Sequence, residues 1–150
     1  MTVLATAGHV DHGKSTFVNF LTGQETDRLK EEKIRGLTIN LGYTYFEFKN
    51  KRISIVDVPG HVDYFKNTIA GFANVDGIIF CIDSVQGWSR QSEEHFQAIR
   101  NLQINNIFFV LNDTKTLPLS SSSDLITLVS FYNSKWSRSS DDPKEEQYAD

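Results

Sequence analysis

Short apolar runs alternate with amphipathic stretches along the first 111 residues. Apolar runs at 3–7, 77–82 and 107–111 predict buried strands, while residues 43–48 and 52–57 predict a hairpin around Lys49-Asn50-Lys51. Apolar residues at helical spacing predict helices directly after Gly13, from Val62 to Phe72 and from Gln91 to Leu102. This order predicts an α/β fold with a mainly parallel sheet, one antiparallel edge hairpin and helices on both faces.

A glycine-rich segment follows the first predicted strand directly. It reads Gly8-His9-Val10-Asp11-His12-Gly13-Lys14-Ser15 and matches G-x-x-x-x-G-K-[ST], the P-loop, in the required strand–loop–helix context. Glycine at both ends lets backbone N–H groups turn toward phosphate oxygens, and the following helix adds its positive dipole end. The lysine should reach the β- and γ-phosphates, and the serine hydroxyl should ligate Mg²⁺. We therefore predict a P-loop NTPase whose nucleotide-binding residues are Val10, Asp11, His12, Gly13, Lys14, Ser15 and Thr16.

Two further segments carry groups suited to a phosphate-bound Mg²⁺. Asp57 ends the second hairpin strand and precedes Pro59-Gly60-His61, so its carboxylate can hold Mg²⁺ through water while the Gly60 N–H meets the γ-phosphate. The polar stretch from Gly23 to Leu41 is either a solvated surface loop or a segment that Mg²⁺ and the γ-phosphate order. In the second interpretation, Thr38 supplies a hydroxyl ligand to the metal.

Composition limits the class of protein. The 150 residues suffice for one domain, and the net charge of −4 gives no electrostatic reason to expect direct binding to nucleic acid or to a membrane surface. No apolar run approaches the length of a membrane span, and the single cysteine, Cys81, suits a reducing compartment. We expect a cytoplasmic protein with a nucleotide-binding core at residues 1–118 and a diverged or disordered segment at 119–150.

Together these motifs resemble the GTPase domain of translational elongation factors, over a continuous stretch from Val3 to Leu111. Residues 8–15 are similar to the first guanine-nucleotide motif of that class, and Asp57-Val58-Pro59-Gly60-His61 is similar to its second switch. Arg35-Gly36-Leu37-Thr38-Ile39 with Leu41-Gly42-Tyr43 looks like the selenocysteine-specific branch, which is related to elongation factor Tu.

The resemblance implies Mg²⁺-dependent hydrolysis of GTP to GDP. His61 would orient the attacking water, Val10 and Leu37 would form an apolar gate in front of it, and Asp11 would help to bind a monovalent cation. His9, His12 and His95 are expected to be structural or solvent-facing. The implied partners are the ribosome and selenocysteinyl-tRNA, although the β-barrel domains that hold aminoacyl-tRNA in this family are expected to be absent from these residues.

The guanine-recognition motif departs from the family pattern. Where the family has Asn-Lys-x-Asp, this chain has Asn112-Asp113-Thr114-Lys115. A lysine offers no acceptor to the guanine N1–H and amino group, so guanine binding should weaken by about ten- to a hundredfold if Asn112, Asp113 and Lys115 still face the base. Three functions therefore remain open: a GTPase of a translation factor, a pseudo-GTPase or truncated nucleotide-binding module with little turnover, and a P-loop enzyme that uses another nucleotide.

Overall fold

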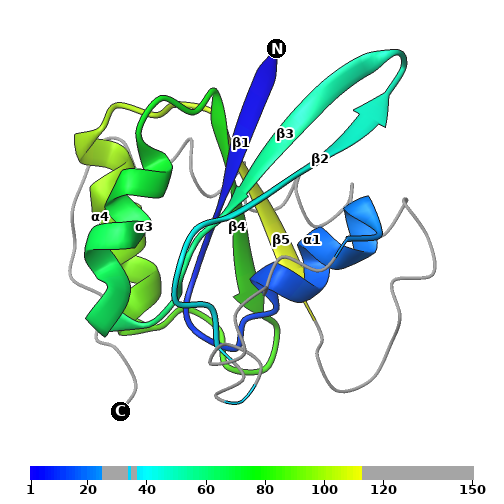
Figure 1. The fold of residues 1–150 in the computed structure, drawn as a ribbon. Helices are drawn as coiled ribbons and strands as arrows, with labels where there is room; N and C mark the ends of the chain where they lie inside the picture. The colour runs from blue at the N-terminus through cyan, green and yellow to red at the C-terminus, as the bar shows by residue number, and fades with distance from the viewer. Residues whose placement is uncertain (25–33, 35–36, 113–150) are drawn as a thin grey trace.

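The computed structural model describes residues 1–24, 34 and 37–112. The expectations for residues 113–150 therefore lie outside the described residues. The helices and strands, drawn in Figure 1, are β1 (Thr2–Ala7), α1 (Lys14–Thr22), β2 (Gly42–Phe48), β3 (Lys51–Asp57), the 3₁₀ helix η1 (Val62–Tyr64), α3 (Phe65–Phe72), β4 (Gly77–Asp83), α4 (Arg90–Asn101) and β5 (Ile107–Asn112).

The five strands form one sheet in the order β2-β3-β1-β4-β5. β1 pairs in parallel with β3 and β4, β4 pairs in parallel with β5, and only β2 runs antiparallel, against β3. The hairpin turns through Lys49 and Asn50, both at positive φ (49° and 61°), which is the backbone of a type I′ turn. The predicted mainly parallel sheet with one antiparallel edge hairpin is confirmed.

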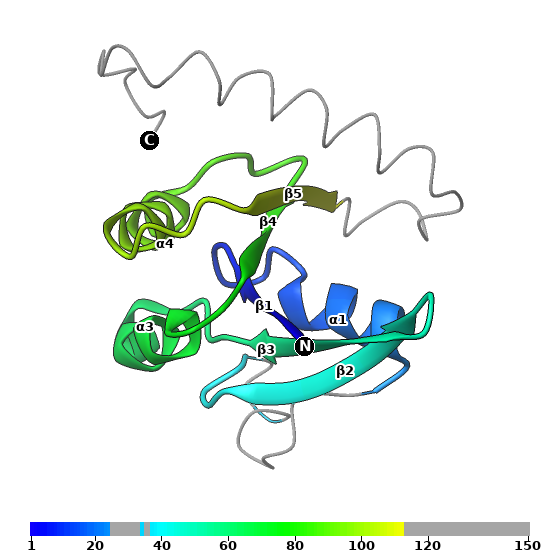
Figure 2. The same cartoon turned by 90° about the horizontal axis from the view of Figure 1, so that it is seen from above.

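Helices cover both faces of this sheet. α3 and α4 lie together on one side and α1 lies on the other, as Figures 1 and 2 show. Successive residues of β4 point to opposite faces, so Ile78 and Phe80 join the core under α3 and α4, while Ile79 and Cys81 pack with Phe17 of α1. All of β4 is buried, as the apolar run at 77–82 predicts, and so is Asp83 at its end.

Three details of the sequence prediction are wrong. The segment after His61 begins as the 3₁₀ helix η1, and Val62 there is 51% exposed; the α-helix starts only at Phe65. The helix predicted to reach Leu102 ends at Asn101, and Leu102, which is its C-cap, is 43% exposed. β5 is only partly buried, with Phe108 47% exposed, because β5 is the last strand on its side of the described sheet.

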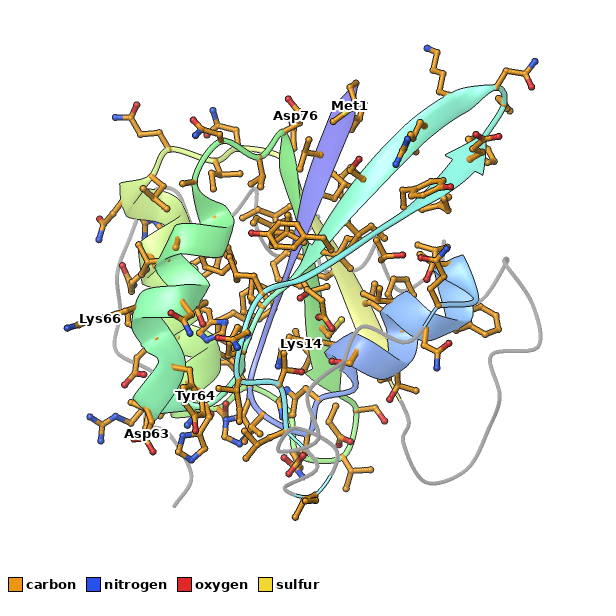
Figure 3. All side chains as sticks on the ribbon, in the orientation of Figure 1. Met1, Lys14, Asp63, Tyr64, Lys66 and Asp76 are labelled. Atoms are coloured by element: carbon orange, nitrogen blue, oxygen red, sulfur yellow. The ribbon has the colours of Figure 1, made fainter. Side chains whose placement is uncertain are left out.

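The topology brings the segments that carry the predicted site residues to one edge of the sheet. The carboxyl ends of β1, β3, β4 and β5 meet there, since these four strands are parallel. Figure 3 shows Lys14 toward this edge and Met1 and Asp76 at the opposite end of the sheet. Within the described ranges, every helix is too short or too polar to cross a membrane.

Candidate nucleotide-binding site

The phosphate-binding loop joins β1 to α1 through backbone that favours glycine. Gly8 has φ 124° and Gly13, the N-cap of α1, has φ 78°. A Cβ on Gly8 would collide with the carbonyl oxygen of Cys81 in β4, so the loop can start this close to the sheet only without a side chain. Asp11 also lies at positive φ (63°), which gives the loop a sharp turn between the two glycines.

Lys14 is held within this loop. Its side chain is nearly buried, at 6% relative exposure, and its Nζ donates to the carbonyl oxygens of Gly8 (3.1 Å) and His9 (2.9 Å). A buried ammonium needs such acceptors, because an unpaired charge away from water is costly. The ammonium is thereby fixed in the loop, where a bound phosphate group would meet it.

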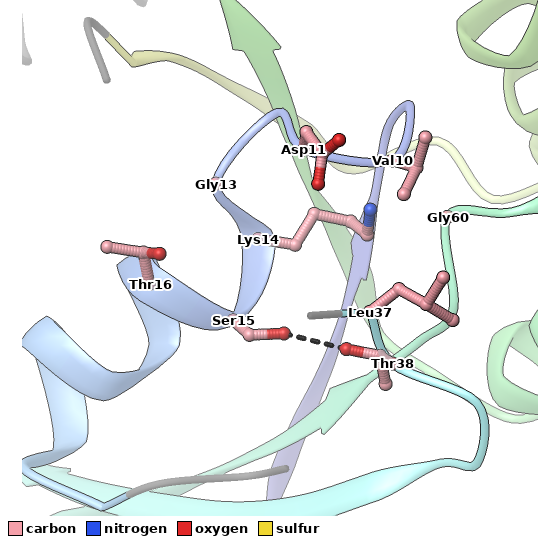
Figure 4. A pocket seen from close by; sticks show the side chains of 9 residues that line it. All are labelled: Val10, Asp11, Gly13, Lys14, Ser15, Thr16, Leu37, Thr38 and Gly60. Carbon is pink, nitrogen blue, oxygen red and sulfur yellow. Dashed lines mark hydrogen bonds between the residues drawn. The ribbon is translucent and has the colours of Figure 1, made fainter. Parts of the chain in front are cut away.

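A cleft opens in front of the loop, and Figure 4 shows the side chains around it. Its lining consists of Val10, Asp11, Gly13, Lys14, Ser15, Thr16, Leu37, Thr38 and Gly60. Each of these nine residues is among the site residues expected from the sequence, although they come from three separate segments. The structure thus brings these nine predicted site residues together around one cavity.

Two hydroxyl groups in the cleft have the spacing of metal ligands. Ser15 Oγ and Thr38 Oγ1 lie 2.9 Å apart in a hydrogen bond, drawn dashed in Figure 4. Adjacent oxygen ligands of an octahedral Mg²⁺, each roughly 2.0–2.1 Å from the ion, are about 3 Å apart, so both hydroxyls could ligate one ion with little movement. This hydroxyl pair is therefore the candidate metal centre; among the described residues there is no group of three or more His, Cys, Asp and Glu that could hold a metal.

Asp57, the third predicted metal-binding residue, is fully buried at the end of β3. Its Oδ1 accepts a hydrogen bond from Thr6 Oγ1 (2.8 Å), and the same hydroxyl oxygen accepts from the Val58 N–H (3.0 Å). Asp57 is absent from the cleft lining. This arrangement is compatible with the predicted contact to Mg²⁺ through water rather than directly.

Gly60 lies directly against the phosphate-binding loop. A Cβ at this position would collide with Lys14 Nζ and would lie 2.7 Å from the Val10 nitrogen. Only glycine therefore allows the segment between β3 and η1 to approach the loop this closely. Gly60 lines the cleft, and the contact of its N–H with a γ-phosphate stays a prediction.

His61, the predicted catalytic residue, is not part of the cleft lining. Its side chain is 35% exposed, and its Nδ1 accepts the Asp63 N–H (3.2 Å), which caps η1. Val10 and Leu37, the predicted gate, do line the cleft. The catalytic role of His61 and the gating role of these two side chains stay predictions.

The two histidines of the phosphate-binding loop, His9 and His12, contact each other and neighbouring side chains. His12 is fully buried, with Nε2 3.2 Å from Gln86 Oε1, and its ring meets that of His9 edge-on at 5.0 Å between centroids. Burial lowers the pKa of both rings, with Lys14 as a further cause for His9 and the His9 ring as a further cause for His12. Both side chains are thereby favoured in their neutral form.

His95 takes a structural position, which is one of the two alternatives that the sequence left open for the histidines. It is 1% exposed rather than solvent-facing, and its Nδ1 accepts the Gly8 N–H at 3.1 Å. Burial, with Lys14 as a second cause, lowers its pKa to about 3. Its position four residues before the buried Ile99 was the available signal, because residues at this spacing share one face of a helix.

Of the altered guanine-recognition motif at residues 112–115, the structure describes only the first residue. Asn112 ends β5, and its Nδ2 donates to the His12 carbonyl oxygen at 2.7 Å, tying β5 to the phosphate-binding loop. Asp113 and Lys115 lie outside the described residues. Their contact with a guanine base stays a prediction.

The sequence of this chain is similar to those of known elongation factors. A family model described as the elongation factor Tu GTP binding domain matches residues 1–125. A selenocysteine-specific elongation factor of Haemophilus influenzae is 40% identical over 109 residues, which are 73% of this chain and 18% of that protein. The counterpart in Escherichia coli is 41% identical over 99 residues, or 65% of this chain and 16% of that protein.

Solved structures agree with these sequence relatives. A bacterial selenocysteine-specific elongation factor, EF-Sec, is similar with a TM-score of 0.75 and 38% identity, over 90% of this chain and 24% of that chain. Translation elongation factor SelB of Methanococcus maripaludis, solved with the GTP analogue GPPNHP, has a TM-score of 0.65 and 25% identity, over 90% of this chain and 26% of that chain. The chain thus spans about a sixth to a quarter of the length of these relatives.

Proposed function

Because the chain belongs to the family of the elongation factor Tu GTP-binding domain, we propose that it binds GTP and GDP with Mg²⁺ and hydrolyses GTP. The observation that carries this proposal is the cleft itself, in which nine predicted residues from three segments line one cavity. The spacing of the Ser15 and Thr38 hydroxyls at 2.9 Å supports the metal part of the proposal.

Each residue of the cleft has a defined role in this proposal. Backbone N–H groups of the loop and the start of α1 would bind the phosphates, and the Lys14 ammonium would stabilise charge that develops on them. Ser15 and Thr38 directly, and Asp57 through water, would hold Mg²⁺, which when bound neutralises phosphate charge. The hydrogen bond between the two hydroxyls keeps Thr38 next to α1.

Hydrolysis additionally needs a positioned water. His61 would orient it, and this requires the ring to turn from its contact with Asp63 toward the cleft past Val10 and Leu37. The acceptance of the Asp63 N–H by Nδ1 leaves the proton of the neutral ring on Nε2. In this proposal the structure corresponds to a state in which the histidine is held away from the reaction.

The relatives' names support a narrower proposal for the whole protein. They are selenocysteine-specific elongation factors, so we place this chain in a factor that delivers selenocysteinyl-tRNA to the ribosome in the cytoplasm. Residues 1–118 would form the GTP-binding core of that factor. Contacts with tRNA and ribosome would then involve parts of the relatives that this chain does not span.

Nucleotide binding is tested by titrating the purified 150-residue chain with fluorescent GDP and Mg²⁺, with unlabelled GTP, ATP and XTP as competitors. Lys14→Ala should weaken binding by about ten- to a hundredfold, the loss expected for charged hydrogen bonds to phosphate. Lys66→Ala, which removes an exposed lysine on α3, is the matched control and should bind as the natural chain does. Equal affinity of the Lys14→Ala and Lys66→Ala variants would refute the proposed site.

Turnover and base selection need two further variants. His61→Ala should slow phosphate release from GTP on the order of a hundredfold while leaving GDP affinity unchanged. The double variant Asp113→Lys/Lys115→Asp should tighten GDP binding if Lys115 faces the base. Tight, guanine-selective binding by the natural sequence would instead show that the altered motif keeps its selectivity, and hydrolysis at the natural rate after His61→Ala would remove that residue from the mechanism.

A further inference from the structure

Side chains from residues 86–95 contact alternate residues of the phosphate-binding loop. This segment contains the end of the loop after β4 and the first half of α4. The three contacts are Gly8 N–H to His95 Nδ1 (3.1 Å), Val10 N–H to Gln91 Oε1 (3.5 Å) and His12 Nε2 to Gln86 Oε1 (3.2 Å). Gln86 is itself placed by Asp83, whose Oδ1 accepts the Gln86 N–H at 2.8 Å. The loop therefore has a second set of contacts besides its cleft.

The contact of His95 with Gly8 is the shortest of the three and the most buried. The last residue of β1 that pairs with β4 is Ala7, opposite Phe80. Gly8 comes directly after it, so the Gly8 N–H lies beyond the paired residues of the sheet. Both Gly8 and His95 are buried, and the ring nitrogen satisfies this backbone donor. A buried N–H without an acceptor is unfavourable, so the loop would have to rearrange if the histidine nitrogen were lost.

Gly8 also contacts the ammonium group of Lys14. The Gly8 carbonyl oxygen accepts from Lys14 Nζ at 3.1 Å, so His95 and Lys14 bind two neighbouring backbone groups of one residue. We propose that His95 is a positioning residue for phosphate binding: its unprotonated Nδ1 fixes Gly8, and Gly8 helps to hold the Lys14 ammonium in the loop. This inference rests on the proposed function, because it assumes that phosphate binds at this loop.

Packing alone does not explain a histidine at this position. The ring lies 5.9 Å from the rings of Phe65 and Phe72 of α3, surroundings in which a leucine or phenylalanine side chain would be equally suitable. Burial, the Lys14 cation and the neighbouring His9 ring all lower the pKa of His95, so the neutral ring is favoured. A protonated ring would lose its acceptor and repel Lys14, so the neutral form is the one that can fix Gly8.

Two substitutions separate an acceptor role from a packing role. His95→Asn keeps an acceptor close to the place of Nδ1 but leaves space around it, whereas His95→Leu fills the space but offers no acceptor. Ile99→Ala, one turn further along α4 at a fully buried site, is the control for loss of stability alone. Each variant of the 150-residue chain is titrated with fluorescent GDP and Mg²⁺, and its unfolding midpoint in urea is measured without nucleotide.

We expect GDP affinity to depend on a hydrogen-bond acceptor at position 95, and stability to depend on how well the buried side chains pack. His95→Leu should weaken GDP binding about ten- to a hundredfold, while His95→Asn and Ile99→Ala should stay within about threefold of the natural chain despite lower stability. If affinity instead falls in the order of stability, with His95→Asn as the weaker binder, His95 only fills the core and the inference is overturned.

A second measurement distinguishes this inference from the proposed function. If the natural chain binds no GDP, the proposed function fails, and hydrogen exchange of the Gly8 amide then decides the role of His95. Slow exchange in the natural chain and in His95→Asn, with fast exchange in His95→Leu, would support fixation of Gly8 by the acceptor. Equal exchange in all three would overturn it.

Discussion

Acidification should destabilise the fold through His95. The side chain is 1% exposed, and burial, followed by the effect of Lys14, lowers its pKa from 6.5 to about 3. The folded chain therefore keeps this ring neutral at pH 5, whereas the unfolded chain protonates it below about pH 6.5. Since the unfolded state binds more protons in this range, stability is complete above pH 6.5 and is lost as the pH falls toward 3.

The size of the effect follows from the two pKa values. Between pH 7 and pH 5, protonation of the unfolded histidine lowers the free energy of unfolding by about 2 kcal/mol, since one pKa unit corresponds to about 1.4 kcal/mol. By pH 3 the loss reaches roughly 4–5 kcal/mol, which is comparable to the whole stability of many small domains. His9 and His12, whose pKa values are also lowered, add losses of the same sign.

The assay is urea unfolding at pH 5, 6, 7 and 8, without nucleotide, followed by tryptophan fluorescence. Trp88 is a suitable reporter because its ring stacks on the buried Phe80 at 5.1 Å between centroids. The comparison is between the natural chain and His95→Asn, which lacks the titrating ring but retains His9, His12 and all carboxylates. The natural chain should lose about 2 kcal/mol more than the variant between pH 7 and pH 5.

Parallel pH profiles of the two chains would refute the reasoning. They would mean that His95 titrates in the folded state near its ordinary pKa, and hence that its ring is accessible to protons and does not serve as a neutral acceptor for Gly8. A lower stability of His95→Asn at all pH values would not rescue the argument, because loss of packing is independent of pH.

Two other predictions concern the core. Cys81 is fully buried and its pKa is raised to about 12 by burial, so a thiol reagent at pH 8 should label it only after unfolding in urea; rapid labelling of the folded chain would contradict its placement in β4. Ile99→Ala should lower the free energy of unfolding by about 2–5 kcal/mol, whereas Leu102→Ala at a 43% exposed C-cap should change it by less than about 1 kcal/mol. Similar losses in both variants would mean that α4 is oriented differently on the sheet.

The phosphate side of the site was predictable because its information is local. Eight consecutive residues specify the loop, and the residues after β3 specify Asp57 and Gly60 through a strand end and a turn. The parallel sheet then brings these ends together without further information, since parallel strands share one carboxyl edge. Thr38 comes to the same edge because it precedes β2, which runs antiparallel to β3 so that Gly42 lies opposite Asp57, and there Thr38 contacts Ser15.

What could not be predicted depends on how one element lies on another. The bond between Gly8 and His95 joins residues 87 positions apart and requires α4 to be placed beside the end of β1, which no periodicity encodes. Leu102 continues the apolar spacing of α4, but the helix ends at Asn101 and the pattern no longer applies. His61 does not line the cleft, and the acceptance of the Asp63 N–H by its Nδ1 is a local contact that the motif around Gly60 does not encode.

The central place of β1 determines the order in which the sheet can assemble. Of the five described strands β1 comes first in the chain, yet Leu4 pairs with Ile55 of β3 on one side and with Gly77 of β4 on the other. The β2–β3 hairpin, whose partners adjoin in sequence, is the first pairing available to a growing chain, and it can bind β1 along one edge. A nascent chain halted before Gly77 would leave the other edge of β1 open to non-native pairing, so the end of β4 synthesis marks the point at which this edge becomes protected.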